Sequence, residues 1–348
     1  MNGVACWPLS PERPPMNRRQ LLAAAVMSAT LATVGCSAGS EPAASPAAGG
    51  QGGSAAAGGF PVTIATKFGD VTVENRPTRV VALGWGDAED ALELGVQPVG
   101  ASDWLGFGGE GVGPWLEGKY TTAPTIIETM EPSYEKIAAL KPDLILDVKS
   151  SGDQARYDRL KQIAPVVGVP EGGDSYLTTP EQQLEMIAAA LGEKQKGEQL
   201  KAAVDANFAK VTAAHPDWKG KTATAVTKTS EGWGAYTKGG DRVAFLSRLG
   251  FTQNPAIDAM PADATGFSVK LSAENLDAID SDLVVGFPIF IKTAQMTGDA
   301  AFQAVPAVKD GRAVVIDGDL ASAFSLGSPA AQNYAIDNLV PKIEAALK

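Results

Sequence analysis

Aromatic and cationic residues recur directly after the hydrophobic runs that this sequence offers as β-strands. In an open α/β sheet, ligands sit beyond the carboxyl ends of the strands, so side chains at these places are candidates for binding. Aromatic rings supply contact area for a bulky ligand, and Lys or Arg pairs with its negative groups. The candidates are Trp85, Asp103, Trp104, Lys149, Lys228, Trp233, Tyr236, Arg242, Phe287, Phe290, Lys292 and Phe324.

These candidates also have structural interpretations. Trp85 and Trp233 each lie beside glycine in a loop, where a large apolar side chain has no evident place in a core. Arg242 opens a helix just after a loop, so it can face a ligand. The alternatives are a core position for Trp104 and Phe287 and a solvated loop position for Lys228 and Lys292.

The small number of His and Cys residues restricts metal chemistry. The chain has one His, His215, and two Cys. A zinc or manganese site of the usual nitrogen and sulfur type needs more such ligands, so a free-metal site is disfavoured, although an all-carboxylate site stays open. No G-x-S-x-G or P-loop string occurs, and the glycine-rich segment 106–113 matches neither a Rossmann nor a Walker spacing. We interpret that segment as a mobile loop at the rim of a binding site.

Two segments in which short buried strands alternate with helices flank one long helical segment. The alternation over residues 60–179 predicts βα units around a largely parallel sheet, after a β-hairpin that turns at Gly69-Asp70. Residues 180–216 carry apolar side chains at helical spacing and predict one long helix or two collinear ones. The alternation resumes over residues 217–348. The predicted fold is α/β, with two lobes that each hold a mostly parallel β-sheet flanked by helices and are joined by one long helix.

One unit occurs in both predicted lobes. SYEKIAALKPDLIL begins at Ser133, and SAENLDAIDSDLVV begins at Ser272. Each predicts a helix that is capped by serine and followed by a strand, with Glu135 or Glu274 in the first helical turn. The helix dipole stabilises a carboxylate at that end by roughly 0.3–1 kcal/mol, which can explain both glutamates on structural grounds alone.

Residues 16–36, MNRRQLLAAAVMSATLATVGC, have the features of an export signal. Two arginines precede a run of small and apolar residues that is too short to span a membrane comfortably. The run ends at Cys36 in a stretch that resembles the lipobox of bacterial lipoproteins, in which the cysteine is lipidated. We expect a signal peptide over residues 1–35, with residues 1–15 as an upstream extension if Met16 is the true start.

The segment after this cysteine has the composition of a linker. Residues 36–59 are rich in Gly, Ala, Ser and Pro, which cannot bury enough apolar surface to offset chain entropy, so we expect a flexible tether. The net charge of the whole chain is −11, which argues against nucleic acid as a partner. The string NRRQLL also resembles a twin-arginine signal loosely, so the export route stays open.

The segments RVVALGWGDAEDALELGVQPVGASDW, EPSYEKIAALKPDLILDV and YDRLKQIAPVV resemble the N-terminal lobe of ABC-transporter substrate-binding proteins of the iron-siderophore and vitamin B12 class. FLSRLGF and VKLSAENLDAIDSDLVVGF resemble their C-terminal lobe. The resemblance covers about residues 60–348. It implies two lobes joined by a rigid helix, a shallow cleft between them, and a lipoprotein on the outer face of the cytoplasmic membrane.

This resemblance implies the function as well. The protein would be a monomer that captures a ferric siderophore reversibly, without catalytic residues or a cofactor, and delivers it to an ABC permease dimer. In the resembling family an acidic residue on each lobe docks onto the permease, and Glu135 and Glu274 occupy these positions. Binding of haem or a corrinoid on the same fold is one alternative. An exported enzyme on a two-lobed α/β scaffold is another, although no nucleophile–base–acid string favours it.

Overall fold

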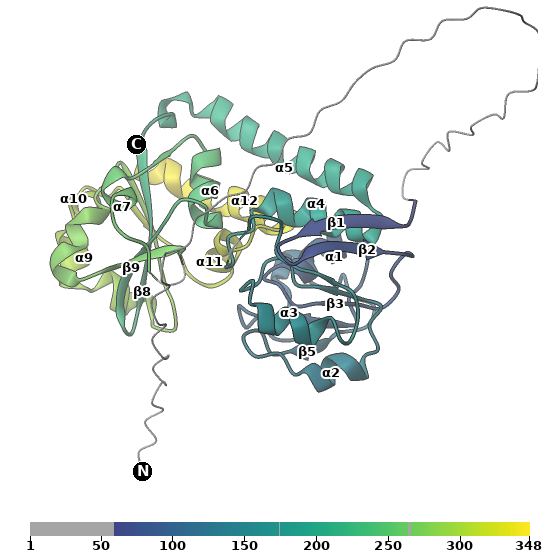
Figure 1. Cartoon of the computed structure of the whole chain (residues 1–348). Coiled ribbons are helices and arrows are strands. Elements are labelled where there is room, and N and C mark those ends of the chain that lie inside the picture. The colour runs from purple at the N-terminus through teal and green to yellow at the C-terminus, as the bar shows by residue number, and fades with distance from the viewer. Residues whose placement is uncertain (1–58, 174, 264–265) are drawn as a thin grey trace, which may run out of the picture. The chain divides into compact units, whose positions relative to one another are not determined.

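The hydrophobic runs of the first half form a parallel sheet in this computed structural model, which describes residues 59–173, 175–263 and 266–348 (Figure 1). The strand order is β5-β4-β3-β6-β7, and all neighbouring pairs are parallel. Helices pack on the sheet, so its central strands are fully buried, as their unbroken apolar sequences predict. We call this part the N-terminal lobe. It contains β3 (Val80–Ala82), α1 (Asp87–Glu93), β4 (Gly100–Ser102), η1 (Pro114–Leu116), β5 (Thr125–Ile127), α2 (Tyr134–Ala139), β6 (Leu144–Leu146), α3 (Gln154–Leu160) and β7 (Val166–Val167).

The predicted hairpin precedes this sheet and lies beside α4 (Figure 1). Its strands are β1 (Val62–Thr66) and β2 (Gly69–Val73), which are antiparallel. Thr66 pairs with Gly69, so the turn residues are Lys67 and Phe68 rather than the predicted Gly69-Asp70. The Thr66 hydroxyl closes this turn, because it donates to the Gly69 carbonyl at 2.7 Å and accepts from the Phe68 N–H group at 3.1 Å.

The second half forms a mixed sheet, which with its helices makes up the C-terminal lobe. The strand order is β11-β9-β8-β12-β13, and β10 also pairs with β8. The pairs that include β10, β12 or β13 are parallel, and β9 is antiparallel to both of its neighbours. The strands are β8 (Thr222–Thr229), β9 (Gly232–Tyr236), β10 (Thr252–Gln253), β11 (Ser268–Leu271), β12 (Leu283–Pro288) and β13 (Ala313–Val315). The helices are η2 (Pro216–Trp218), α6 (Asp241–Arg248), α7 (Pro255–Asp258), η3 (Ala273–Ile279), α8 (Thr293–Thr297), α9 (Ala300–Ala304), α10 (Pro306–Lys309), α11 (Gly318–Ser325) and α12 (Pro329–Ala346).

The segment that we predicted as one long helix or two collinear ones forms two helices, α4 (Pro180–Leu191) and α5 (Lys194–Ala214). Gly192 ends α4 in the left-handed conformation, with φ at 72°. A residue in that conformation cannot continue an α-helix, which is why the helix breaks there. Along α5, Leu200 packs on the core of the N-terminal lobe and Phe208 on the core of the C-terminal lobe, so α5 contacts both lobes.

The repeated unit folds similarly in the two lobes. Ser133 caps α2 and Ser272 caps η3, each by accepting a backbone N–H group at 3.3 Å. The aspartates of the two units also match, since each accepts the N–H group of a threonine near the start of a neighbouring strand: Asp143 from Thr78 and Asp282 from Thr222. The second helix differs from the prediction, because η3 has 3-10 geometry with a non-helical Asn275 inside it. Asn weakens a helix since its side chain competes for backbone hydrogen bonds.

The predicted signal peptide, Cys36 and nearly all of the predicted tether lie outside the described residues. Within the part of the chain that the structure describes, no helix combines the length and the apolar character needed to cross a membrane.

Candidate ligand site where the lobes meet

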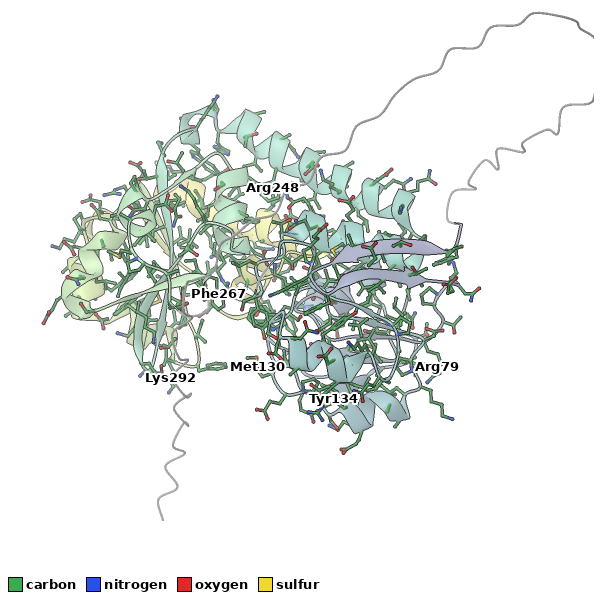
Figure 2. All side chains as sticks on the ribbon, in the orientation of Figure 1. Arg79, Met130, Tyr134, Arg248, Phe267 and Lys292 are labelled. Atoms are coloured by element: carbon green, nitrogen blue, oxygen red, sulfur yellow. The ribbon has the colours of Figure 1, made fainter. Side chains whose placement is uncertain are left out.

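Aromatic side chains of both lobes gather beyond the carboxyl end of β3. The ring of Trp85 lies between those of Trp104 and Tyr176, at centroid distances of 4.1 and 4.0 Å and interplanar angles of 5° and 22°. Phe267 of the C-terminal lobe, labelled in Figure 2, meets Trp85 edge-on at 6.4 Å. We call these four residues the aromatic cluster. It brings together Trp85 and Trp104, which the sequence predicted as ligand contacts, with two residues that it did not.

Backbone contacts hold the cluster in place. The Trp85 N–H group donates to the Lys149 carbonyl at 2.9 Å, and the Trp85 carbonyl accepts from the side chain of Gln183 at 2.7 Å. The Tyr176 N–H group donates to the Ser150 carbonyl at 2.8 Å. Tyr176 has φ at 56°, a left-handed conformation that is uncommon for an aromatic residue and clusters at functional sites.

The indole Nε1–H groups of Trp85 and Trp104 are buried and donate to no acceptor among the described residues. A buried donor without an acceptor loses its hydration without compensation, which costs about 1–3 kcal/mol. Two such donors therefore lie on adjacent stacked rings without a partner in the described part of the chain.

A buried ion pair joins the lobes beside this cluster. Lys149 follows β6, and its Nζ atom lies 2.5 Å from both carboxylate oxygens of Asp241, the first residue of α6. The two side chains are only 5% and 8% exposed. Sequence analysis predicted Lys149 as a ligand contact, but its charge is already matched by a carboxylate of the chain.

Arg242, the next residue of α6, has a different environment. Its guanidinium carbon lies 4.2 Å from the ring centroid of Tyr236 and 5.1 Å from that of Phe287. Its Nε–H group donates to the Ser325 hydroxyl at 3.1 Å. Tyr236, Phe287 and Phe324 are almost wholly buried in the core of the C-terminal lobe, so they support Arg242 more than they offer surface to a ligand.

The remaining predicted contacts are spread over several environments. Trp233 is buried in a separate core of the C-terminal lobe and stacks on Phe302 at 5.2 Å, a structural position. Lys228 lies over the Trp233 ring and is ion-paired with Asp299. The other three are exposed or support loops: Phe290 is fully exposed with φ at 57°, Lys292 is exposed, and the Asp103 carboxylate accepts the N–H groups of Phe107 and Gly108 at 3.0 and 2.8 Å.

The glycine-rich segment 106–113 is anchored rather than free within the structure. Its Phe107 ring packs edge-on against Trp115 at 5.7 Å, and Trp115 in turn contacts Tyr334 of α12 at 5.1 Å. Gly108 has φ at 75°, a value that L side chains rarely adopt. The segment thus reaches from the N-terminal lobe to a helix of the other lobe.

Carboxylates of α1 provide a second polar contact between the lobes. Glu89 accepts the indole N–H group of Trp115 at 3.0 Å and also bonds the Ser328 hydroxyl that caps α12. Glu93 accepts the N–H group of Ala330, in the first turn of α12, at 2.9 Å. Negative charge is favourable at the N-terminal end of a helix, so α1 of one lobe holds α12 of the other.

Burial perturbs these acids strongly. It raises the pKa of Asp87 to about 7, and it raises the pKa of Glu93 to about 7 as well. Burial also raises the pKa of Glu89 above its usual range. The pKa of Asp90 lies well above its usual range, because the carboxylate is buried and because the charges of neighbouring acids, Glu93 first, repel it.

Sequence reasoning missed Tyr176, Phe267, Asp241 and the acids of α1. The strand-end rule applied to β7 would have nominated Tyr176, since it lies in the loop that follows this strand. Phe267 stands beside a glycine, the feature that favoured Trp85. The pairing of Asp241 with Lys149 spans 92 residues, and no local pattern predicts it.

The single histidine is part of a helix end. His215 stacks on Trp218 at 4.0 Å and its Nε2 atom lies 2.9 Å from a Glu344 oxygen, so it packs on the protein. Among the described residues, no group of three or more His, Cys, Asp and Glu side chains is arranged to hold a metal ion.

Two α/β lobes of this kind are also the architecture of solute-binding proteins. The chain belongs to the periplasmic binding protein family, and the sequence model of this family matches residues 80–320. It is 27% identical, over 76% of its length, to the Bacillus subtilis protein named "Probable siderophore-binding lipoprotein YfiY", and the match covers 81% of that relative. Three other curated relatives are matched over 31% to 44% of their own length.

Solved structures share the whole fold. A periplasmic solute binding protein of Mycobacterium smegmatis has a TM-score of 0.71 and 27% identity, and the match covers 83% of this chain and 99% of that one. PiaA of Streptococcus pneumoniae, solved in complex with ferrichrome, has a TM-score of 0.70 and 25% identity, with 82% and 98% covered. The two-lobed α/β architecture predicted from the sequence is therefore confirmed.

Proposed function

We propose that this protein captures a ferric siderophore and delivers it to the permease of an ABC importer. The observation that carries the proposal is the aromatic cluster at the lobe interface, with two buried indole N–H groups that have no acceptor among the described residues. Such a surface suits a bulky chelate with apolar walls and outward-facing oxygens. The siderophore-binding name of YfiY and the ferrichrome complex of PiaA support the same ligand class.

Binding without chemistry fits the residues at this interface. Lys149 and Asp241 neutralise each other, and no nucleophile with an adjacent base lies among the described side chains of the aromatic cluster. The family consists of binding proteins, so the proposal includes neither a catalytic step nor a cofactor. Capture is reversible, and the protein acts as a monomer.

We further propose that the protein is exported and anchored to the outer face of the cytoplasmic membrane through a lipid on Cys36. Residues 1–35 would be removed as a signal peptide, and residues 36–59 would tether the binding lobes, residues 60–179 and 217–348. The lipoprotein name of YfiY supports this location.

Glu135 and Glu274 are proposed as contacts to the permease dimer. Both carboxylates are exposed and form no ion pair with other described residues. Glu135 also lines a surface pocket of about 550 Å³ together with Tyr134, which Figure 2 labels, and Arg159. One exposed carboxylate on each lobe, at matching places in the repeated unit, suits a partner with two equivalent subunits.

Charge reversal tests this docking role. The double variant Glu135→Lys and Glu274→Lys should abolish iron uptake by cells while leaving ligand affinity unchanged. A matched control reverses two other exposed carboxylates, Glu74 and Glu231, and should retain uptake. Normal uptake by the first variant would remove these residues from the proposed interface.

Tryptophan fluorescence tests the ligand class. The full chain is titrated with a ferric hydroxamate, a ferric catecholate, haem and cobalamin. We expect quenching by a ferric chelate at micromolar or lower concentration, because Trp85 and Trp104 stand in the site. Quenching only by haem or cobalamin would favour the alternative ligands on this fold, and no quenching by any ferric chelate would refute the proposal.

A further inference from the structure

Carboxylates of the chain itself neutralise most cations where the lobes meet. Lys149 lies 2.5 Å from Asp241, and Arg156 lies 2.7 Å from Asp147. No side chain in these two pairs is more than 9% exposed. A ligand could use either cation only by leaving a buried carboxylate unpaired, which is strongly unfavourable.

Arg242 is not neutralised in this way. Lys228 is ion-paired with Asp299, but Arg242 has no carboxylate within ion-pair distance among the described residues. Its Nε–H group is used by the Ser325 hydroxyl, and its guanidinium rests on the face of Tyr236. The two terminal nitrogens of Arg242 thus remain as one unmatched positive group held on a rigid aromatic support.

One hollow near this interface has an acidic lining. A hollow of about 530 Å³ lies between the glycine-rich segment and α11, and its lining includes Glu110, Glu117 and Asp319 but neither Lys nor Arg. The chain as a whole carries a net charge of −11. The net negative charge would therefore repel a ligand with several negative charges as it approaches.

The neutral donors at the site are more numerous than the free charges. Within the described ranges the two buried Nε1–H groups of Trp85 and Trp104 lack acceptors, and both rings are stacked in the aromatic cluster. Indole N–H groups donate to carbonyl oxygens without requiring a charged ligand. These groups suit neutral oxygen acceptors flanked by apolar surface, with Arg242 available for one negative group.

We propose that the ligand is a ferric hydroxamate chelate with zero net charge or a single negative charge. This inference rests on the proposed function and narrows its ligand class. Three hydroxamates release one proton each and balance Fe³⁺, whereas three catecholates release two each and leave three negative charges on the complex. The indole N–H groups bond carbonyl or hydroxamate oxygens, the rings cover the apolar walls, and Arg242 takes the single negative group where the chelate has one.

A charge series of ferric chelates tests the inference with the full chain. The probes are ferrichrome, which is a neutral trihydroxamate, a mixed hydroxamate–citrate chelate with one negative charge, and a ferric tris-catecholate with three. Ferrichrome should bind at least about 100-fold more tightly than the tris-catecholate, with an affinity that barely changes with salt. Equal or tighter binding of the tris-catecholate would overturn the charge inference and leave the proposed function standing. Binding of no ferric chelate would overturn both.

Arg242→Gln provides the residue-level test. This variant should bind the singly charged chelate about tenfold more weakly or worse, and its affinity for ferrichrome should fall less than about threefold. The difference arises because only the charged chelate pairs with the guanidinium group. Lys309→Gln, on the exposed end of α10, makes the same change of net charge away from the site and should alter neither affinity. If Arg242→Gln lowers the affinity for both chelates equally, Arg242 stabilises the fold of the site and does not pair with a negative ligand group. That result would overturn its assigned role.

Discussion

The buried acids of α1 predict that the protein becomes more stable when the pH falls from about 8 to about 5.5. Burial sets the pKa of Asp87 in the folded chain at about 7, against an ordinary 3.8, and that of Glu93 at about 7, against 4.5. At a pH between the ordinary and the raised pKa values, these carboxyl groups hold protons in the folded chain that they have already released in the unfolded chain. The free energy of unfolding therefore falls as the pH rises through this window and increases as the pH is lowered.

The size of the effect follows from the width of the window. One pKa unit corresponds to about 1.36 kcal/mol, and about 1.5 units separate pH 7 from pH 5.5, so each of the two groups contributes about 2 kcal/mol. The total of about 4 kcal/mol corresponds to a rise in Tm of about 10 °C. Acids whose pKa is lowered by hydrogen bonds, such as Asp143 and Asp282, weaken the fold only below about pH 4, outside this window.

Thermal unfolding of the full chain, followed by circular dichroism across this pH range, measures the effect. Asp90→Asn should raise Tm at about pH 8 and reduce the gain in Tm on acidification. It removes a buried acid, one oxygen atom of which has no hydrogen-bond partner in the part of the chain that the structure describes. Asp70→Asn, at an exposed position of β2, is the matched control and should leave the profile unchanged. A Tm that stays level or falls between about pH 8 and about pH 5.5 would refute this reasoning.

Three substitutions test other parts of the structure. Lys149→Met leaves Asp241 buried and unpaired and should lower the free energy of unfolding in urea by about 3–5 kcal/mol. The double variant with Asp241→Leu should regain most of this free energy. Equal stability of the single and double variants would contradict the ion-pair assignment. Trp85→Leu removes the central ring of the aromatic cluster and should weaken chelate binding about 30-fold or more in calorimetric titrations, and an unchanged Kd would place the ligand elsewhere. Gly192→Ala puts a Cβ atom on a residue with φ at 72° and should lower the free energy of unfolding in urea by about 1–2 kcal/mol. An unchanged free energy together with stronger helical circular dichroism would show that α4 and α5 have merged into one helix.

Local sequence patterns were sufficient for most of the architecture. Unbroken apolar runs identified the central strands β3 and β6, because a parallel sheet covered on both faces needs such runs. The position of Gly192 marked the point where the long helical segment divides. The turn of the hairpin was misplaced, since the hydroxyl of Thr66 moves the turn two residues earlier than the glycine indicates.

Contacts between distant segments explain what the sequence did not reveal. The segment DAEDALE of α1 has the composition of a solvated helix, yet two of its acids are buried by distant segments. Asp87 accepts hydrogen bonds from the Val148 N–H group and the Gln183 side chain of α4, and Glu89 bonds Trp115 and the Ser328 hydroxyl that caps α12. Trp233 follows a strand and stands between glycines, but the neighbouring strands and Phe302 enclose it. A rule based on strand ends selects positions along the chain and cannot tell which face of the sheet receives the side chain.

Calorimetric titration of the full chain with iron-loaded and iron-free ferrichrome tests the central claim most directly, because it measures affinity and stoichiometry without a label. We predict one chelate per chain with a Kd in the micromolar range or below for the iron-loaded form, and at least about tenfold weaker binding of the iron-free form, which is less rigid. Absence of binding by ferrichrome and by every other ferric chelate would contradict the account.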